Sequence, residues 1–362
     1  HSDIATLNVG DGILLQELPF DLMLKKFRVD FYSTGMPKRF ASDIVIIDKA
    51  TGQQFEHTID VNKPVTYKGV TLYQASFDDG GSTLRLKVHG LTPGSDEVSD
   101  VTGIVGDSLR LKQNGTPLTL ELTNLRPINV ENLTEEKQVD NRQKLLQHLG
   151  NAARSTDKVF RNVGPSFIFK LRDAAGQARE FHNYMLPVMQ DGRGFFMAGM
   201  RESQTDPFRY LRIPADEEGK LDAWFALRTV LTDAKSHKTI AARFAARAMR
   251  GEAISETLRS KLAATAERTL DLYGSGGYGA LDKFLRETVE EKEQGHAPEI
   301  FVKVLQGCAW EAWQLQRERA HLKPLEINQA RTFFVDDVLN SVSVSFHYGA
   351  PVFIQLAGFE EV

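Results

Sequence analysis

The sequence predicts an α+β protein: a β-rich sandwich or open-barrel lobe, then a helical lobe, closed by a C-terminal strand. Residues 1–215 contain short segments in which apolar and polar residues alternate, with turn sequences between them, as in half-buried antiparallel sheets. Residues 216–330 instead space their apolar residues three or four apart, which is typical of helices. The tail, 331–362, returns to alternation from Val342 to Phe359 and predicts a return strand that packs on the β-rich lobe.

Length and composition agree with a division into lobes. The chain has 362 residues, more than the roughly 250–300 at which a single hydrophobic core stops growing. Apolar residues make up 41% and charged residues 25%, close to the composition of globular domains. The net charge is −4, with no long block of one sign, so nucleic acid is not an expected partner.

The first β block is predicted from alternation and from short apolar runs bounded by turn residues. Its strands are expected at residues 27–31, 44–47, 65–67, 70–73, 84–88, 109–111 and 118–122. Lys68-Gly69 separates one pair of these strands, and Asn114-Gly115 separates another. Glycine supplies the positive φ that tight turns need, so both pairs are expected to form hairpins.

A helix interrupts the β-rich lobe, and further helices follow it. The interrupting helix is expected over 133–149, and residues 150–165 are expected to be a linker. The second β block has predicted strands at 167–171, 181–186, 195–200 and 208–213. In the helical lobe, Ile254, Leu258 and Leu262 lie four apart and predict one apolar face. Helices are also expected at 280–293 and 300–322.

Gly106-Asp107-Ser108-Leu109 matches the nucleophile block of one class of lipases. That chemistry needs the serine on a strand-to-helix turn with a histidine base nearby. Ser108 instead opens a predicted strand, and no histidine in the chain has an aspartate three residues before it, as that class requires. A hydrolase that uses Ser108 is therefore an alternative rather than the first hypothesis.

Arg243, Arg247 and Arg250 fall at i, i+4 and i+7 of a predicted helix and form a cationic stripe. Such a stripe can bind anionic lipid head groups or the carboxylates of a ligand. The simpler interpretation is the solvated face of an amphipathic helix. The three arginines are candidates for a partner surface.

Cys308 is the only cysteine, so no disulfide can form within the chain. It lies near Trp310 and Trp313 in a predicted helix, where a small buried apolar side chain is the simpler interpretation. The alternative is a thiol that meets a partner's cysteine, and that role needs exposure and a lowered pKa. With this alternative open, Cys308 joins the arginines as a partner-surface candidate.

Neither a metal site nor a catalytic group is predicted. Glu293–His296 and Glu318–His321 have the Glu-x-x-His spacing of di-iron bundles, but Gly295 and Pro298 break the first helix and the second pair ends a charged run. Gly274–Gly279 has a dinucleotide-binding spacing, yet it follows a predicted helix and is expected to join two helices. Structural, hydrogen-bonded roles are expected for the histidines in predicted strands: His57, His89, His182 and His347.

Several segments, in order along the chain, resemble signatures of the ResB family. Phe27–Asp43 reads FRVDFYSTGMPKRFASD, and Lys170–Pro187 resembles the proteobacterial branch of that family. The other segments are 61–64, 67–69, 73–77, 208–215 and 353–359. The last of these resembles the stretch just before the family's final membrane helix.

This resemblance implies the extracytoplasmic domain of a ResB-like subunit of the system II cytochrome c maturation complex. Such a domain faces the periplasm at the bacterial inner membrane, and membrane helices are expected outside both ends of this chain. The complex carries haem outward and attaches it to Cys-x-x-Cys-His of apocytochrome c, so the parent complex acts as a holocytochrome c synthase. Expected partners are a ResC-like membrane subunit, apocytochrome c and a thioredoxin-like thiol reductant. The parent complex handles the haem, and no cofactor is expected in this chain.

The first functional hypothesis is a platform outside the membrane that holds apocytochrome c and shapes the site of covalent haem attachment. It would contribute orientation rather than catalytic groups, since orientation alone lowers a barrier substantially. A partner peptide could add to an exposed strand edge. The alternatives are a periplasmic hydrolase that uses Ser108 and a haem- or lipid-surface-binding domain that uses the arginine stripe.

Overall fold

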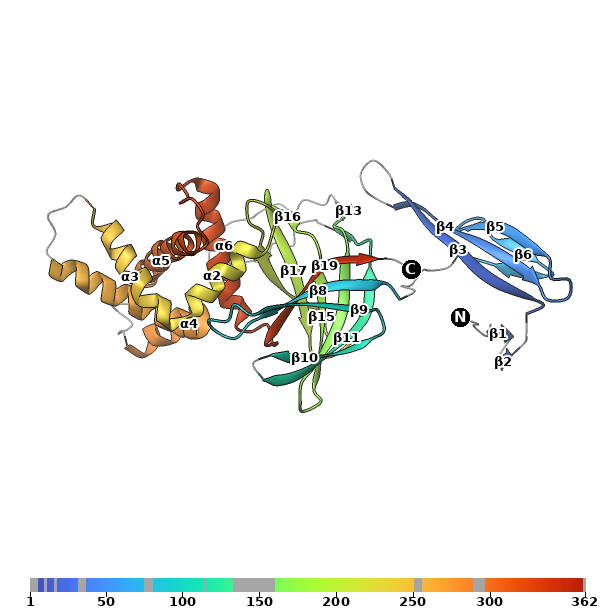
Figure 1. The fold of residues 1–362 in the computed structure, drawn as a ribbon, viewed down its shortest axis with the longest axis horizontal. Helices are drawn as coiled ribbons and strands as arrows, with labels where there is room; N and C mark the ends of the chain where they lie inside the picture. The colour runs from blue at the N-terminus through green and yellow to red at the C-terminus, as the bar shows by residue number, and fades with distance from the viewer. Residues whose placement is uncertain are drawn as a thin grey trace, which may run out of the picture. The chain divides into compact units, whose positions relative to one another are not determined.

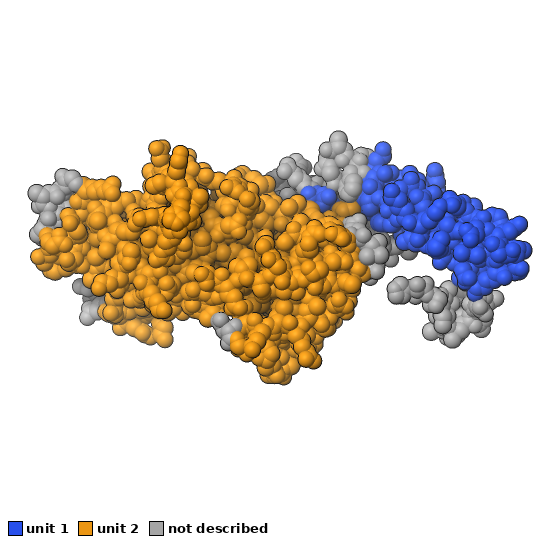
Figure 2. Space-filling model, viewed as in Figure 1, with its two compact units in different colours: residues 1–78, 130–162 blue, residues 79–129, 163–362 orange. Residues whose placement is uncertain are grey.

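The computed structural model describes residues 6–9, 12–15, 18–31, 37–74, 81–113, 115–132, 160–250, 256–288 and 297–360. The chain forms two compact units (Figure 2): unit 1 comprises residues 1–78 and 130–162, and unit 2 comprises residues 79–129 and 163–362. Unit 2 contains all of the described helices together with two β-sheets (Figure 1). The predicted division into segments 1–215, 216–330 and 331–362 follows secondary structure, whereas the compact units have different boundaries. That division therefore stays a prediction.

Unit 1 is built on a three-stranded antiparallel sheet. Its strands are β3 (Phe20–Phe31), β4 (Pro37–Asp48) and β5 (Gln54–Asp60), in the order β3-β4-β5. The predicted strands 27–31 and 44–47 lie within β3 and β4. Unit 1 also contains three two-stranded pairs: β1 (Thr6–Val9) with β2 (Gly12–Leu15), β6 (Val65–Tyr67) with β7 (Val70–Leu72), and β12 (Val130–Asn132) with β13 (Phe160–Asn162).

The β6–β7 hairpin confirms the prediction made from Lys68-Gly69. These two residues have φ values of 45° and 80°, so both turn positions are left-handed, as a two-residue hairpin turn requires. Apolar hairpin residues pack against one face of the β3-β4-β5 sheet and form a small core with it. The buried members of that core are Phe20, Ile44, Ile46 and Ile59.

The carboxylate of Asp48, at the end of β4, fastens the hairpin to the sheet. It accepts hydrogen bonds from Tyr67 Oη at 2.7 Å and from the backbone N–H groups of Ala50 and Thr51 at 2.9 and 3.0 Å. Lys68 Nζ forms an ion pair with the same carboxylate. The Lys68 ammonium and the Tyr67 hydroxyl hold the pKa of Asp48 well below its usual range. The Tyr67-Lys68-Gly69 segment thus acts as a clamp on β4.

Unit 2 contains two antiparallel sheets that share one hydrophobic core. The larger has the order β10-β11-β14-β15-β17-β16, with β18 also paired to β17, and the smaller has the order β19-β8-β9. The bounds are β8 Thr83–Gly90, β9 Val98–Ile104, β10 Ser108–Gln113, β11 Thr116–Arg126, β14 Ser166–Arg172, β15 Ala178–Tyr184, β16 Val188–Gln190, β17 Arg193–Arg201, β18 Arg209–Pro214 and β19 Val352–Glu360. The larger sheet curls into a half-barrel (Figure 1), within the predicted β-rich class.

The helices of unit 2 gather at one end of its sheets (Figure 1). They are α2 (Asp222–Thr232), α3 (Ala234–Ala248), α4 (Glu256–Thr288), α5 (Ala297–Arg319) and α6 (Gln329–Ser345). Leu258 is 51% exposed, so the apolar face predicted through it is not the buried one. The buried face of α4 instead contains Ala266, Leu270 and Tyr273, spaced three or four apart.

The glycine-rich segment Gly274–Gly279 lies at a break within α4, in agreement with the predicted junction between two helices. Gly276 and Gly277 leave the helical conformation, and Gly277 has a φ of 65°. A Cβ atom at Gly277 would also lie 2.4 Å from Ser343 Oγ on α6. Close packing against α6 and a left-handed backbone therefore require glycine at this position.

The predicted return strand is confirmed at β19, which pairs antiparallel with β8 from Val352↔Gly90 to Glu360↔Thr83. The alternation expected from Val342 is wrong for the residues before it, because α6 continues to Ser345. Val335, Val338, Leu339 and Val342 are buried at helical spacing, and this longer periodic set outweighs the short alternation at its end. The helix predicted at 133–149 lies outside the described residues.

Asn183 on β15 ties β19 to the larger sheet. Its side-chain Nδ2 donates to the Ile354 carbonyl at 2.8 Å, and Tyr348 Oη donates to its Oδ1 at 3.3 Å. Asn183 is 2% exposed, so both bonds are shielded from water. One buried amide therefore links the closing strand to the larger sheet, in addition to the ladder that pairs it with β8.

Acid should loosen the clamp on Asp48. Because its pKa is depressed in the folded state, its contribution to stability is present above the unfolded carboxyl pKa of about 4 and is lost as pH falls below it. We expect hydrogen-exchange protection factors of residues 37–74, measured by mass spectrometry, to drop below about pH 4. Asp48→Asn should lower them already at pH 7, whereas the exposed Asp21→Asn should not. Equal protection in wild type and Asp48→Asn at pH 7 would rule out the clamp.

Removing the Asn183 amide should destabilise unit 2. Asn183→Ala leaves the Ile354 carbonyl without its donor, which costs about 1–3 kcal/mol of unfolding free energy when the group stays buried. Urea unfolding measures this loss, with Asn340→Ala, an exposed position on α6, as the matched control. An Asn183→Ala variant as stable as the control would show that the amide does not fix β19.

Candidate functional site

Ser108 is the exposed first residue of β10 and pairs with Glu121 of β11. It follows Gly106, whose φ of 100° belongs to the turn that enters the strand. Among the described residues, no histidine is hydrogen-bonded to Ser108. The strand-to-helix turn and the base that a serine nucleophile needs are both missing at this position, so the structure gives the hydrolase alternative no support here.

A buried serine–histidine contact does occur elsewhere, and sequence reasoning missed it. Ser166 Oγ on β14 lies 2.8 Å from His182 Nε2 on β15, and the two residues are 0% and 4% exposed. His182 Nδ1 lies 2.9 Å from Tyr210 Oη on β18. No short motif marks Ser166, because its partners His182 and Asn129 lie 16 and 37 positions away in the sequence.

The direction of these hydrogen bonds shows that His182 does not activate Ser166. Asn129 Nδ2 donates to the carbonyls of Arg126 and Gly164 at 3.1 and 2.7 Å, which turns Asn129 Oδ1 toward Ser166. Ser166 Oγ–H donates to that oxygen at 3.1 Å. His182 Nε2–H must then donate to Ser166 Oγ, and His182 Nδ1 accepts from Tyr210.

Burial lowers the pKa of His182 to about 4, helped by the positive charges of Arg126 and Arg201. The ring is therefore neutral near pH 7, in agreement with one donor and one acceptor nitrogen. The hydrogen bonds of Ser166, His182 and Tyr210 therefore link β14, β15 and β18 within the larger sheet. They do not form the nucleophile–base pair of a hydrolase.

The other histidines in predicted strands are placed differently from one another. His89 on β8 is buried, lies 2.8 Å from Gln355 Oε1 on β19 through its Nε2, and stacks on Phe225 at 3.9 Å. His57 is exposed on β5. His347 lies in the turn between α6 and β19 rather than in a strand, because α6 ends only two residues earlier.

Two of the three stripe arginines join α3 to α5. Arg247 Nε lies 2.6 Å from Glu311 Oε1, and Arg243 Nε lies 3.4 Å from Glu311 Oε2. The Glu311 side chain is 8% exposed, so these ion pairs are partly shielded from solvent. Arg243 Nη1 also pairs with Glu318 at 2.8 Å, and Arg250 is exposed beyond the end of α3. A partner surface at these arginines stays a prediction.

Cys308 is 0% exposed, and burial together with the nearby Glu311 raises the pKa of its thiol to about 12. Both conditions for a thiol that meets a partner's cysteine are therefore unmet. The expectation of Cys308 at a partner surface is wrong, and the interpretation as a small buried side chain is confirmed. It is packed in the unit 2 core together with Trp310 and Trp313.

The candidate site lies instead on unit 1, at the outer edge of β3. This 12-residue strand spans roughly 40 Å. It pairs with β4 on one edge, and no strand within the described residues pairs with its other edge. Leu22, Met23 and Leu24 on this strand are 48, 48 and 59% exposed. A long edge strand with exposed apolar residues is a ready template for another chain.

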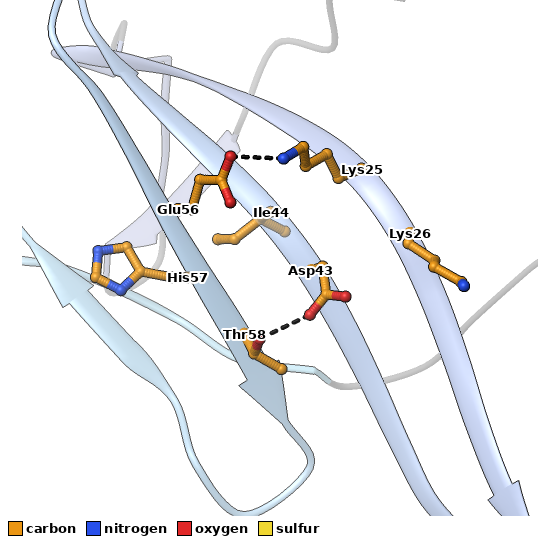
Figure 3. A pocket seen from close by; sticks show the side chains of 7 residues that line it. All are labelled: Lys25, Lys26, Asp43, Ile44, Glu56, His57 and Thr58. Carbon is orange, nitrogen blue, oxygen red and sulfur yellow. Dashed lines mark hydrogen bonds and ion pairs between the residues drawn. The ribbon is translucent and has the colours of Figure 1, made fainter.

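A β-bulge at Lys25 interrupts the ladder between β3 and β4. Beside it lies an open hollow of about 430 Å³ (Figure 3), lined by Lys25, Lys26, Asp43, Ile44, Glu56, His57 and Thr58. Lys25 Nζ pairs with Glu56 at 2.5 Å. Asp43 accepts from Arg28 and from Thr58, both at 2.6 Å. Lys26 has no ion-pair partner within the described part of the chain.

Sequence reasoning placed a strand over 27–31 but did not extend it back to Phe20. Leu22-Met23-Leu24 is an unbroken apolar run, so alternation does not reveal that it is a strand. A usable signal was present: an apolar run followed at once by Lys25-Lys26 and by Arg28 indicates a strand whose two faces differ. That signal does not show that the strand lies at an edge, which depends on long-range pairing.

Within the described residues, no group of three or more histidine, cysteine, aspartate or glutamate side chains is placed to hold a metal ion. None of the described helices combines the length and apolar character that crossing a membrane requires.

Comparison with known proteins gives a family for the whole chain. The ResB-like family model matches residues 1–362. The cytochrome c biogenesis protein CcsB of Picosynechococcus sp. is 38% identical over 69 residues, which are 19% of this chain and 15% of that protein. The CcsB protein of Gloeobacter violaceus is 40% identical over 63 residues, 17% of this chain and 13% of the relative.

A plant relative and the solved structures complete the comparison. The chloroplastic cytochrome c biogenesis protein CCS1 of Oryza sativa subsp. japonica is 34% identical over 73 residues, 20% of this chain and 13% of that protein. The alignments therefore span only a small part of these relatives' own lengths. No solved structure matches the chain.

The Cys308 thiol should be unreactive in the folded protein. Because it is buried and its pKa is raised to about 12, we expect an aromatic disulfide reagent at pH 8 to label it only after denaturation. Absorbance of the released thiolate measures the reaction, and the urea-unfolded chain is the control. Rapid labelling of the native chain would place Cys308 at the surface.

Proposed function

Because the chain belongs to the ResB-like family, we propose that it acts in cytochrome c biogenesis as an extracytoplasmic platform that holds apocytochrome c. The names of the CcsB and CCS1 relatives support the process. The periplasmic location, at the bacterial inner membrane, belongs to this proposal. So do the ResC-like membrane subunit and the thioredoxin-like reductant as partners.

The outer edge of β3, with which no described strand pairs, is the observation that carries this proposal. Apocytochrome c must present the segment around Cys-x-x-Cys-His in an accessible form before haem is attached. An extended segment can add to an open edge through main-chain hydrogen bonds, which do not depend on its side chains. The exposed Leu22, Met23 and Leu24 offer apolar contacts beside those bonds.

The platform contributes positioning to the attachment reaction. Haem is the substrate that the parent complex delivers, and the thiols of Cys-x-x-Cys-His are the groups that react with it. Holding the peptide extended limits its motion and orients its thiols, which converts a loose encounter into an ordered one. We assign no catalytic role to a side chain of this chain. No described histidine contacts Ser108, and the Ser166 hydroxyl donates its hydrogen bond to Asn129 Oδ1.

Binding of an apocytochrome segment tests the proposal. We expect a fluorescent peptide with Cys-x-x-Cys-His and its flanks to bind the full chain, as measured by anisotropy under reducing conditions. Leu24→Lys should weaken binding about fivefold, since cross-strand contacts contribute up to about 1 kcal/mol. Leu258→Lys on α4, at 51% exposure against 59%, is the matched control.

Two control peptides sharpen this experiment. A peptide with prolines at alternate positions cannot form the ladder and should not bind, whereas a Ser-x-x-Ser-His peptide shows what the thiols add. Equal weakening by Leu24→Lys and Leu258→Lys, or tight binding of the proline peptide, would exclude capture at β3.

A further inference from the structure

The two faces of β3 differ in chemistry, and the register with β4 defines them. Leu22 lies opposite Ile46, and Leu24 lies opposite Ile44, so both leucines share the face that the hairpin partly covers. Met23 pairs with Val45 on the other face. That face also carries Asp43 and Glu56, because Val45 lies opposite Glu56 and residues 43 and 45 point the same way.

The apolar face is incompletely covered at its edge. Ile44 and Ile46 on β4 are 3 and 0% exposed, whereas their partners Leu24 and Leu22 are 59 and 48% exposed. Hairpin packing thus protects the central strand and leaves the edge strand bare. A further strand whose apolar side chains point to this face would lie beside the two leucines and remove apolar surface from water.

Around the bulge at Lys25, the opposite face of β3 carries more positive than negative charge. Lys25 pairs with Glu56, and Arg28 pairs with Asp43, which also lies opposite Lys26 in the register. Three cations around the bulge therefore share two carboxylates. An acidic side chain on an added strand would therefore meet a complementary charge.

We propose that the β3 edge selects an extended segment in which apolar and acidic side chains alternate. Side chains of a strand point to opposite faces in turn, so one segment can place its apolar residues beside Leu22 and Leu24 and an acidic residue beside Lys26. This inference rests on the proposed function and gives the captured segment a chemical character. It predicts which part of an apocytochrome sequence docks, whatever the position of its cysteines.

Synthetic eight-residue peptides test the selectivity on the full chain. We expect a fluorescent peptide that alternates valine and glutamate to bind more tightly than the valine–serine peptide, and the valine–lysine peptide to bind most weakly. Each favourable cross-strand charge pair should change affinity by up to about fivefold. The preference for the acidic peptide should shrink as salt is raised from about 50 to about 500 mM, because salt screens exposed ion pairs.

Charge reversal at the edge provides the decisive variant. Lys26→Glu should lose the preference for the glutamate peptide and gain affinity for the lysine peptide. Lys112→Glu is the matched control, since Lys112 is an exposed lysine on β10, an edge strand of unit 2. Gain of affinity for the lysine peptide cannot result from misfolding, so the swap identifies the surface even if Lys26→Glu loses some stability.

The outcomes separate this inference from the proposed function. If the three peptides bind equally and Lys26→Glu changes nothing, the selectivity is overturned, whatever the apocytochrome peptide does. If the acidic peptide binds at β3 but the apocytochrome peptide does not, the selectivity stands and the cytochrome role falls. If no peptide binds, both fall.

Discussion

Pairing of β4 on both of its edges is the constraint on which the candidate site depends. Because β4 takes β5 on one side, β3 can occupy only the other, and its outer edge then faces away from the sheet. The hairpin clamp at Asp48 holds the apolar cover over the central strand and does not reach Leu22 and Leu24. The exposed edge thus follows from the order of three strands and the small size of the hairpin.

Buried polar residues of unit 2 are used for structure. Glu311 joins two arginines of α3, Asn183 holds β19, and the chain of bonds from Tyr210 to Asn129 runs in one direction through the larger sheet. In each case a buried donor or acceptor is satisfied by a protein group, as burial requires. These groups are therefore committed to the scaffold.

Much of the fold could be predicted because its signals are local. The Lys68-Gly69 turn and the alternation at Leu84, Leu86 and Val88 depend on neighbours in the chain, and the structure confirms both. The prediction of a strand from Val342 is wrong, because Val342 and its neighbours fit both the two-residue period of a strand and the 3.6-residue period of a helix over a few residues. The Ser166–His182 contact could not be predicted, since it depends on the register of the β14–β15 hairpin and on which side chains point to the same face. The edge position of β3 could not be predicted either, since it depends on which strands become neighbours. The family resemblance supplied the biological process, which no local pattern contained.

The ladder between β8 and β19 has a consequence for synthesis of the protein. Arg85 and Glu360 form a hydrogen bond although they are separated by 275 positions. During translation, β8 emerges long before its partner, so its apolar residues stay without that neighbour until β19 has left the ribosome. Contacts of such long sequence separation form slowly. Unit 2 therefore completes its native sheets late, and chaperones would meet a chain whose smaller sheet is still incomplete.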